Sequence, residues 1–164
     1  TIPCSYAASI YPIDLYLYQY LVGNAEQSVS VTNRLKRMSH VEKVTEDLIR
    51  HYNAHPEFSD AAKEYIYKKT EGVILSYYVA GCIMNPNKRT GRSDCLRYNT
   101  MIRNLNLEIW NRVRRKFRIY LWMNRFGISY PMYEKMLHSG VYNKLRHNHK
   151  LEKENEAKTE ENLK

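Results

Sequence analysis

Residues 31–52 read VTNRLKRMSHVEKVTEDLIRHY, and this stretch decides the fold class. Its apolar residues recur at spacings of three and four, as they do on one face of an α-helix. They are Val31, Leu35, Met38, Val41, Val44, Leu48, Ile49 and Tyr52. The pattern predicts an amphipathic helix that ends near His55-Pro56, because proline removes a backbone donor and restricts the residue before it.

Helical patterns continue downstream of this stretch. Ser59 and Asp60 are suited to cap a second helix. Its apolar face is expected to contain Ala62, Tyr65, Ile66, Val73, Ile74, Tyr77, Tyr78 and Cys82. The turn-forming run NPNKRTGRSD, residues 85–94, predicts a loop that closes with Ser93 as the cap of a third helix over residues 94–105.

Two more helices are predicted in the second half of the chain. The first covers residues 107–126 on apolar spacing, and Gly127 supplies its C-terminal stop. The second covers residues 131–145 and begins at a proline, which favours the first helical turn. The tail, residues 150–164, mixes Lys and Glu with almost no apolar side chain, which predicts a frayed or disordered end.

The beginning of the chain has a different pattern. The first residues read as a strand, and the run YAASIYPIDLYLYQYLV, Tyr6–Val22, alternates enough beyond Pro12 to predict β-strand. A loop over residues 23–30 follows at a Gly-Asn pair. The expected fold is therefore mainly α, with a short β segment and loop over residues 1–30, an irregular helical bundle over residues 31–149, and the charged tail.

The composition narrows the class of protein. A chain of 164 residues suffices for one hydrophobic core. Its three cysteines lie far apart with no CxxC pair, which argues against a disulfide framework or a zinc site and favours a reducing cytoplasm. No stretch approaches the roughly 20 apolar residues that span a bilayer. Because the chain begins at Thr1 in a strand-like segment, we expect the natural polypeptide to continue upstream.

The formal net charge of +9 favours polyanions or anionic membrane surfaces as partners. The cations concentrate in residues 109–133, which contain no Asp or Glu. The candidate contact residues there are Arg112, Arg114, Arg115, Lys116, Arg118, Trp122 and Arg125. A basic aromatic helix suits a membrane interface or a lipid-linked acceptor. Nucleic-acid phosphates are the second functional alternative, and a bundle helix with core aromatics and solvated arginines explains the same pattern.

The chain contains no recognisable catalytic set. Its six histidines form no HExxH or other tight ligand pattern. His51 and His55 are four residues apart, but no carboxylate sits at metal-ligand spacing between them. Phosphate-binding glycine loops of the GxxxxGK[ST] and GxGxxG types are absent from the sequence. We therefore predict neither a catalytic residue nor a metal site in this chain.

The run IDLYLYQYLVGNAEQSVS, residues 13–30, resembles the closing strand and following loop of family 2 glycosyltransferases with the GT-A fold. In those proteins a tyrosine-rich strand enters a Gly-Arg-x-x-Gln-Ser-type loop, and a long amphipathic helix with a mixture like HVEKVTEDLIRHY follows. Gly23, Gln27 and Ser28 match the loop, whereas Asn24 stands where arginine is expected. The missing cation removes a contact to the donor diphosphate, so the resemblance implies only a pocket-edge role for these four residues.

The resemblance covers the chain well through Tyr52, and the later helices look like a variable C-terminal extension. It implies a non-catalytic C-terminal region that completes the fold of a glycosyltransferase and supports acceptor or membrane contact. An upstream catalytic domain would bind a nucleotide-diphosphate sugar and a divalent metal, at the inner face of the membrane. The alternative is a non-enzymatic basic helical interaction module that binds nucleic acid.

Overall fold

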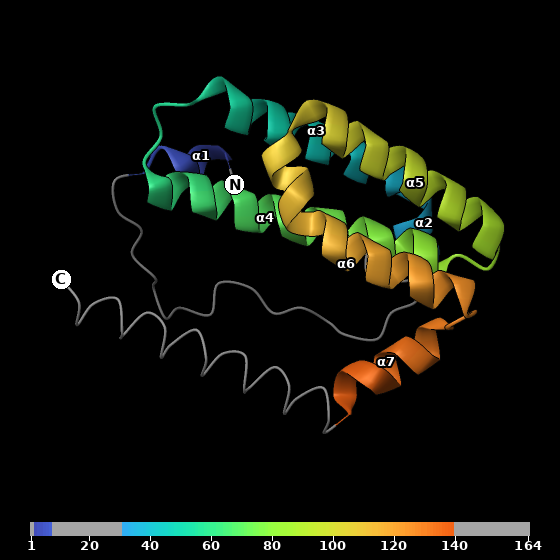
Figure 1. Cartoon of the computed structure of the whole chain (residues 1–164). Helices are drawn as coiled ribbons and strands as arrows, with labels where there is room; N and C mark the ends of the chain where they lie inside the picture. Colours follow the sequence, from blue (N-terminus) through green and yellow to red (C-terminus); the bar gives the residue numbers. More distant parts are fainter. Residues whose placement is uncertain (1, 8–30, 140–164) are drawn as a thin grey trace. The chain divides into compact units, whose positions relative to one another are not determined.

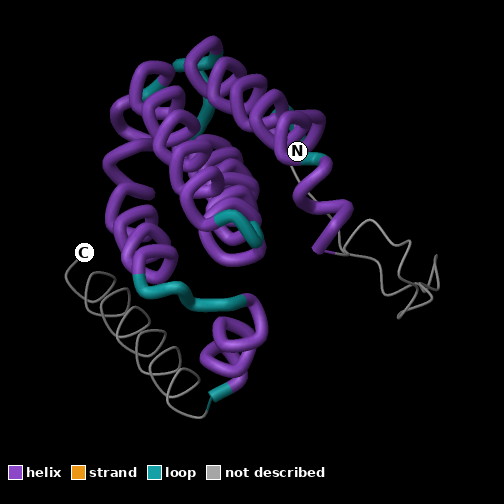
Figure 2. Tube along the Cα trace, turned by 90° about the vertical axis from the view of Figure 1, so that its right-hand side faces the viewer, coloured by secondary structure: helices purple, strands orange, loops and turns teal. Residues whose placement is uncertain are grey.

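The computed structural model describes residues 2–7 and 31–139, and every regular element in these ranges is a helix (Figure 1; Figure 2). The elements are α1 (Ile2–Ser5), α2 (Val31–Lys36), α3 (Met38–Ala54), α4 (Asp60–Tyr78), the π-helix η1 (Val79–Met84), α5 (Lys88–Leu105), α6 (Leu107–Arg125) and α7 (Tyr130–His138). The mainly helical prediction is confirmed. The chain divides into two compact units between Gly127 and Ile128, and α7 belongs to the second.

The beginning of the chain corrects one expectation. Residues 2–5 form the short helix α1, where a strand was predicted. The Ser5 hydroxyl donates a 2.6 Å hydrogen bond to the Ile2 carbonyl, and the Tyr6 N–H donates to the Pro3 carbonyl at 3.3 Å. These local bonds satisfy the turn without a neighbouring strand. The rest of the predicted strand and loop, residues 8–30, and the tail from residue 140 onward lie outside the described residues.

The helix predicted over residues 31–52 is present as α2 and α3, divided at Arg37. The Arg37 N–H donates to the Asn33 carbonyl at 3.1 Å, and the Val41 N–H donates to the Arg37 carbonyl at 3.0 Å. Helical bonding therefore continues across the break. Leu48 is buried as its spacing predicts, whereas Val44 is 47% exposed.

The second helix begins as predicted, and the third begins earlier. The Ala62 N–H donates to Ser59 Oγ at 3.3 Å, so Ser59 caps α4. At the next turn the Thr90 N–H donates to Asn87 Oδ1 at 3.0 Å, and α5 starts at Lys88. The prediction of a loop extending to Ser93 was wrong, because Asn87 provides a cap six residues before it.

The two downstream helices begin as predicted. The Ile109 N–H donates to Asn106 Oδ1 at 2.8 Å, which caps α6. Gly127 follows α6 with a φ of +67°, the left-handed conformation that favours glycine after a helix. In the second unit α7 has Pro131 in its first turn and extends to His138.

Helices α3, α4, α5 and α6 form a bundle around one core (Figure 1). Helix α3 packs against α4 and α5, and α6 packs against the same two helices. The π-helix η1 continues α4 and contacts α5 and α6. The largest fully buried side chains are Tyr77, Tyr78, Tyr98, Ile49, Ile66, Ile74, Ile83, Ile102, Ile109, Val113, Asn124 and Thr45.

Tyrosine rings occupy the centre of this core. Tyr77 stacks on Tyr98 with ring centroids 3.8 Å apart, and Tyr78 meets Tyr98 edge-on at 5.8 Å. Their hydroxyls reach polar partners: Tyr98 bonds with Thr45 Oγ1 at 2.5 Å, and Tyr77 donates to Glu42 Oε1 at 2.5 Å. Burial raises the pKa of all three phenols. Tyrosine is therefore tolerated here because each ring is buried while its hydroxyl is paired.

Candidate functional site on helix α6

The position of α6 is set by a single connecting residue. Asn106 ends α5 through a 2.9 Å bond from its N–H to the Ile102 carbonyl and also caps α6. This leaves no loop in which the relative placement of α5 and α6 could vary. Ile109, Val113 and Phe117, spaced by four, turn toward the core and are buried. The opposite face of α6 is consequently the one that reaches solvent.

Two of the predicted contact residues pair with α4. Arg112 Nη1 donates to Glu64 Oε2 at 2.8 Å, and its guanidinium lies 4.2 Å from the centroid of the Tyr67 ring. Lys116 Nζ donates to Glu71 Oε1 at 2.5 Å. These ion pairs neutralise both cations along the seam between α4 and α6. Arg112 and Lys116 are therefore packing residues of the bundle.

The remaining predicted residues lie on the solvent side of α6, which we call the outer stripe. It consists of Arg114, Arg115, Arg118, Ile119, Trp122, Arg125 and Phe126. At about 100° per residue these positions share an arc of roughly 140° opposite the buried face. Three apolar side chains in the stripe are well exposed: Ile119 at 47%, Trp122 at 58% and Phe126 at 63%. Cations and apolar surface thus occupy one continuous band.

The arginines of the outer stripe differ from Arg112 and Lys116 in their charge pairing. Among the described residues, no carboxylate forms an ion pair with Arg115, Arg118 or Arg125. The guanidinium of Arg114 lies 5.5 Å from the Trp110 ring. A surface notch of about 460 Å³ is lined by Arg115, Arg118, Ile119 and Trp122. The stripe therefore presents a positive potential over a notch with an apolar wall.

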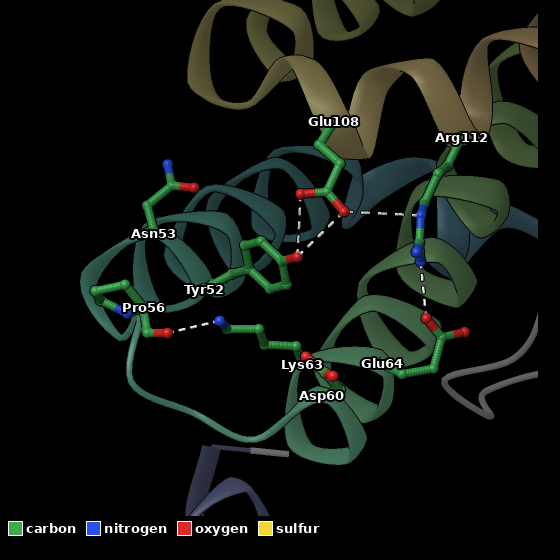
Figure 3. Close-up of a pocket in the computed structure, with 8 residues that line it drawn as sticks. All are labelled: Tyr52, Asn53, Pro56, Asp60, Lys63, Glu64, Glu108 and Arg112. Carbon is green, nitrogen blue, oxygen red and sulfur yellow. Dashed lines mark hydrogen bonds and ion pairs between the residues drawn. The ribbon is translucent and has the colours of Figure 1, made fainter.

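A second, more polar cavity of about 540 Å³ lies between the ends of α3, α4 and α6 (Figure 3). Its lining residues are Tyr52, Asn53, Pro56, Asp60, Lys63, Glu64, Glu108 and Arg112. Most of these groups are already paired within the protein. Tyr52 donates to the Glu108 carboxylate at 3.3 Å, and Lys63 Nζ donates to the Pro56 carbonyl at 2.6 Å. Because these partners satisfy one another, we interpret this cavity as a polar seam that joins three helices.

The two histidines at the end of α3 dock the N-terminal helix. Their ring centroids lie 4.6 Å apart. His51 Nε2 is 3.1 Å from the Ser5 hydroxyl, and His55 Nε2 is 2.9 Å from the Tyr6 hydroxyl. The other nitrogen of His55, Nδ1, lies 2.7 Å from Glu57 Oε1. Within residues 2–7 and 31–139, no group of three or more His, Cys, Asp or Glu is placed to hold a metal ion.

The structure places only part of the predicted site. The pocket-edge residues Gly23, Asn24, Gln27 and Ser28 lie outside the described residues. The seven predicted contact residues of α6 divide into the paired Arg112 and Lys116 and the five that belong to the outer stripe. Ile119 and Phe126 were missing from the predicted contact residues. A helical-wheel projection finds both, because they fall beside Trp122 and opposite the buried face.

Comparisons with known proteins identify no relative of this chain. No family model matches the chain, and neither the curated proteins nor the solved structures contain a match. None of the described helices combines the length and apolar character needed to cross a membrane.

Proposed function

We propose that this chain is the C-terminal helical region of a nucleotide-sugar-dependent glycosyltransferase of family 2, with the GT-A fold. In this role it completes the catalytic fold and supports contact with the acceptor or a membrane. The sequence of residues 13–30 carries the proposal, because its tyrosine-rich run leads into a loop that matches at Gly23, Gln27 and Ser28. The helical stretch from Val31 to Ala54, which follows this loop directly, is in keeping with it.

The chemistry of sugar transfer belongs, in this proposal, to polypeptide upstream of the chain. Transfer requires a stabilised diphosphate leaving group and a deprotonated acceptor. The upstream domain would bind the nucleotide-diphosphate sugar and a divalent metal through acidic ligands. Gly23, Asn24, Gln27 and Ser28 would border the donor pocket, and the α6 outer stripe would face an anionic acceptor or surface.

The test compares three proteins made from the natural gene: the full product, a version that ends at residue 30, and the present chain alone. Release of nucleoside diphosphate is measured with a panel of nucleotide sugars in Mg²⁺ and Mn²⁺. We expect metal-dependent turnover by the full product and none by the present chain. An upstream region without an acidic metal motif, or metal-dependent turnover by the chain alone, would refute the proposal.

A finer test addresses the loop. In the full product, Gln27→Ala is expected to raise the KM for donor or acceptor several-fold, because a pocket-edge residue acts through binding. Ala25→Ser, in the same loop but outside the matched positions, serves as the control and is expected to leave KM unchanged. Equal kinetics of the Gln27 variant and the wild type would remove the pocket-edge role.

The alternative function is a non-enzymatic helical module that binds nucleic acid. The observation that favours it is the presence of four arginines and two exposed aromatic rings on one helix face. Such binding depends steeply on salt, because each phosphate contact releases counterions. Four phosphate contacts predict that the affinity falls on the order of 100-fold between about 50 and 200 mM salt. Titration with single-stranded and duplex oligonucleotides at these two salt concentrations therefore distinguishes this function from the leading proposal.

A further inference from the structure

The outer stripe of α6 has an internal order. Around the helix axis, Arg114, Arg118 and Arg125 lie toward one edge of the band; Arg118 follows Arg114 by about one turn, and Arg125 follows Arg118 by about two. Ile119, Trp122 and Phe126 lie toward the other edge and have the exposures given above. Arg115 also lies on this edge, between Trp122 and Phe126 around the axis. One edge of the stripe is therefore cationic, and the other edge is mainly apolar.

The dimensions of the stripe suit a flat surface. The twelve-residue step from Arg114 to Phe126 corresponds to roughly 18 Å along a straight helix at 1.5 Å per residue. All of its side chains project from the same side of one rigid element that the core holds through Val113 and Phe117. A planar partner can contact the whole band at once without any change in the bundle.

The charges of the stripe require an anionic partner. Arg112 and Lys116 on the neighbouring face are neutralised by Glu64 and Glu71. No described carboxylate pairs with Arg115, Arg118 or Arg125. The guanidinium group presents a planar fork of donors that matches two phosphate oxygens at once. Phosphate esters are therefore the chemistry that these side chains best recognise.

We propose that the α6 outer stripe docks the protein on the surface of an anionic phospholipid bilayer. Arg114, Arg115, Arg118 and Arg125 bind the headgroup phosphates, and Trp122 and Phe126 enter the boundary between headgroups and acyl chains. Tryptophan prefers this boundary because its ring is apolar and its N–H remains hydrated. A helix with these two kinds of side chain lies in the plane of the interface and does not cross the membrane.

The apolar edge favours a lipid surface over nucleic acid. Single-stranded nucleic acid binds through separate aromatic platforms on which successive bases stack. Here the Trp122 and Phe126 rings lie only 4.4 Å apart at a tilt of 47°, so each covers part of the other. Ile119 has no ring to offer a base, although it adds apolar surface to a lipid contact. The inference rests on the proposed function for its biological setting and names the partner of the surface described there.

The first experiment measures binding of the 164-residue chain to vesicles. Vesicles of phosphatidylcholine alone are compared with vesicles that also contain phosphatidylglycerol, by co-sedimentation at low salt. The variant R115Q/R118Q/R125Q removes three cations that form no ion pair with a described residue. We expect the wild type to prefer anionic vesicles and the variant to bind them on the order of 100-fold more weakly, since each cation near the surface contributes about five-fold.

A matched control removes the same net charge from another face. Lys36, Lys43 and Arg50 are exposed on α2 and α3, and none of them belongs to the outer stripe of α6. The variant K36Q/K43Q/R50Q should keep anionic-vesicle binding within a few-fold of the wild type. Circular dichroism verifies that both triple variants retain the helical content of the wild type. Equal weakening in the two triple variants, or no preference of the wild type for anionic vesicles, would overturn the proposal.

A second experiment reports the position of the ring itself. The chain has two tryptophans, and the indole Nε1 of Trp110 has no hydrogen-bond partner, so W110F removes no such bond. In the W110F protein, Trp122 is the one remaining tryptophan, and its emission is excited selectively over that of the tyrosines. Its emission should shift to shorter wavelength on anionic vesicles and remain unshifted with an oligonucleotide. An unshifted emission with bound vesicles, or a higher affinity for the oligonucleotide, would refute membrane docking. Neither assay reads sugar transfer, so either result leaves the test of the proposed function independent.

Discussion

The side-chain amide of Asn124 donates a 2.9 Å hydrogen bond to the main-chain carbonyl of Cys82. It donates a second bond to the Lys88 carbonyl at 3.2 Å and accepts one from Arg92 Nε at 3.2 Å. Asn124 is only 2% exposed, so one buried amide ties the end of α6 to η1 and to the first turn of α5. The π-helix and the start of α5 are held together at this point.

Replacing Asn124 should therefore destabilise the folded protein. We expect Asn124→Leu to lower the free energy of unfolding by about 2–3 kcal/mol, because a buried carbonyl without its donor retains a full desolvation cost. The Cys82 carbonyl would keep only the longer contact from Lys88 Nζ at 3.4 Å. Urea denaturation followed by circular dichroism measures the change. Asn111→Leu, exposed on the same helix, should stay within about 0.5 kcal/mol, and equal losses in both variants would contradict the role of Asn124.

The glycines of the bundle should respond in opposite directions to alanine. A Cβ at Gly91 would overlap the Gly81 carbonyl oxygen and meet Asn85 Cβ at 3.0 Å, whereas a Cβ at Gly72 would meet nothing within 4 Å. We expect Gly91→Ala to destabilise by about 1–3 kcal/mol or more, because η1 and α5 must move apart. Gly72→Ala should stabilise by roughly 0.5–1 kcal/mol, since alanine is the better helix former. Thermal unfolding of the two variants tests this, and a Gly91→Ala protein as stable as the wild type would show that the close approach is not required.

The basic residues of α6 should divide by their effect on stability. Arg112→Gln breaks the ion pair with Glu64 and the stacking on Tyr67, and about 1 kcal/mol is the expected loss for a partly exposed pair of this kind. Arg118→Gln should change the free energy of unfolding by less than about 0.5 kcal/mol, because Arg118 is exposed and forms no ion pair with a described residue. Urea denaturation of both variants provides the measurement. A larger loss for Arg118→Gln than for Arg112→Gln would mean that the outer stripe has a structural role.

The docking of α1 should weaken in mild acid. Burial lowers the pKa of His51, and the neighbouring His55 lowers it further. Between the lowered value and the ordinary histidine pKa of about 6.5, the unfolded chain binds more protons than the folded one. The contribution of neutral His51 to folding stability is therefore fully present above a pH of about 6.5. It is lost as the pH falls through the lowered pKa of His51 in the folded protein. The nearby Glu57 has its pKa lowered by the bond to His55, so it acts in a separate window near and below the ordinary carboxyl range.

The measurement for this prediction is the urea midpoint as a function of pH. Between about pH 7.5 and 5.5, a window that brackets the ordinary histidine pKa, the wild type should lose more stability than His51→Gln. The glutamine amide can still donate to the Ser5 hydroxyl but does not titrate in this range. If the urea midpoints of the two proteins changed in parallel with pH, His51 would be excluded as the source of the stability loss in acid.

The sequence alone determined where most helices lie and most of the residues that face inward, although Val44 of the predicted apolar face is exposed. Ser59 and Gly127 act on their own or adjacent turns, so their effects are readable from neighbouring residues. The spacing of four between Ile109, Val113 and Phe117 follows from helix geometry, and all three are buried. Helix caps and apolar spacing can therefore be predicted without knowing which helix packs against which.

The tertiary structure decided the start of α5 and the burial of the tyrosines. Asn87 and Ser93 are both suitable caps by residue type, and the close approach of Gly91 to Gly81 is a contact between elements that the local pattern does not contain. Tyr77 and Tyr98 are accepted in the core because their hydroxyls find partners on α3, far away in the sequence. Such choices depend on which helices become neighbours.

The candidate site shows the same division. That residues 109–133 are basic and aromatic is a property of the sequence, and so is the placement of Arg115 and Trp122 on the side opposite Val113. Which cations remain available was settled only by packing. Glu64 and Glu71 lie 48 and 45 residues before the cations that they neutralise, and α4 brings them beside α6. An ion pair forms through a distance in space, and that distance exists only once the bundle has assembled.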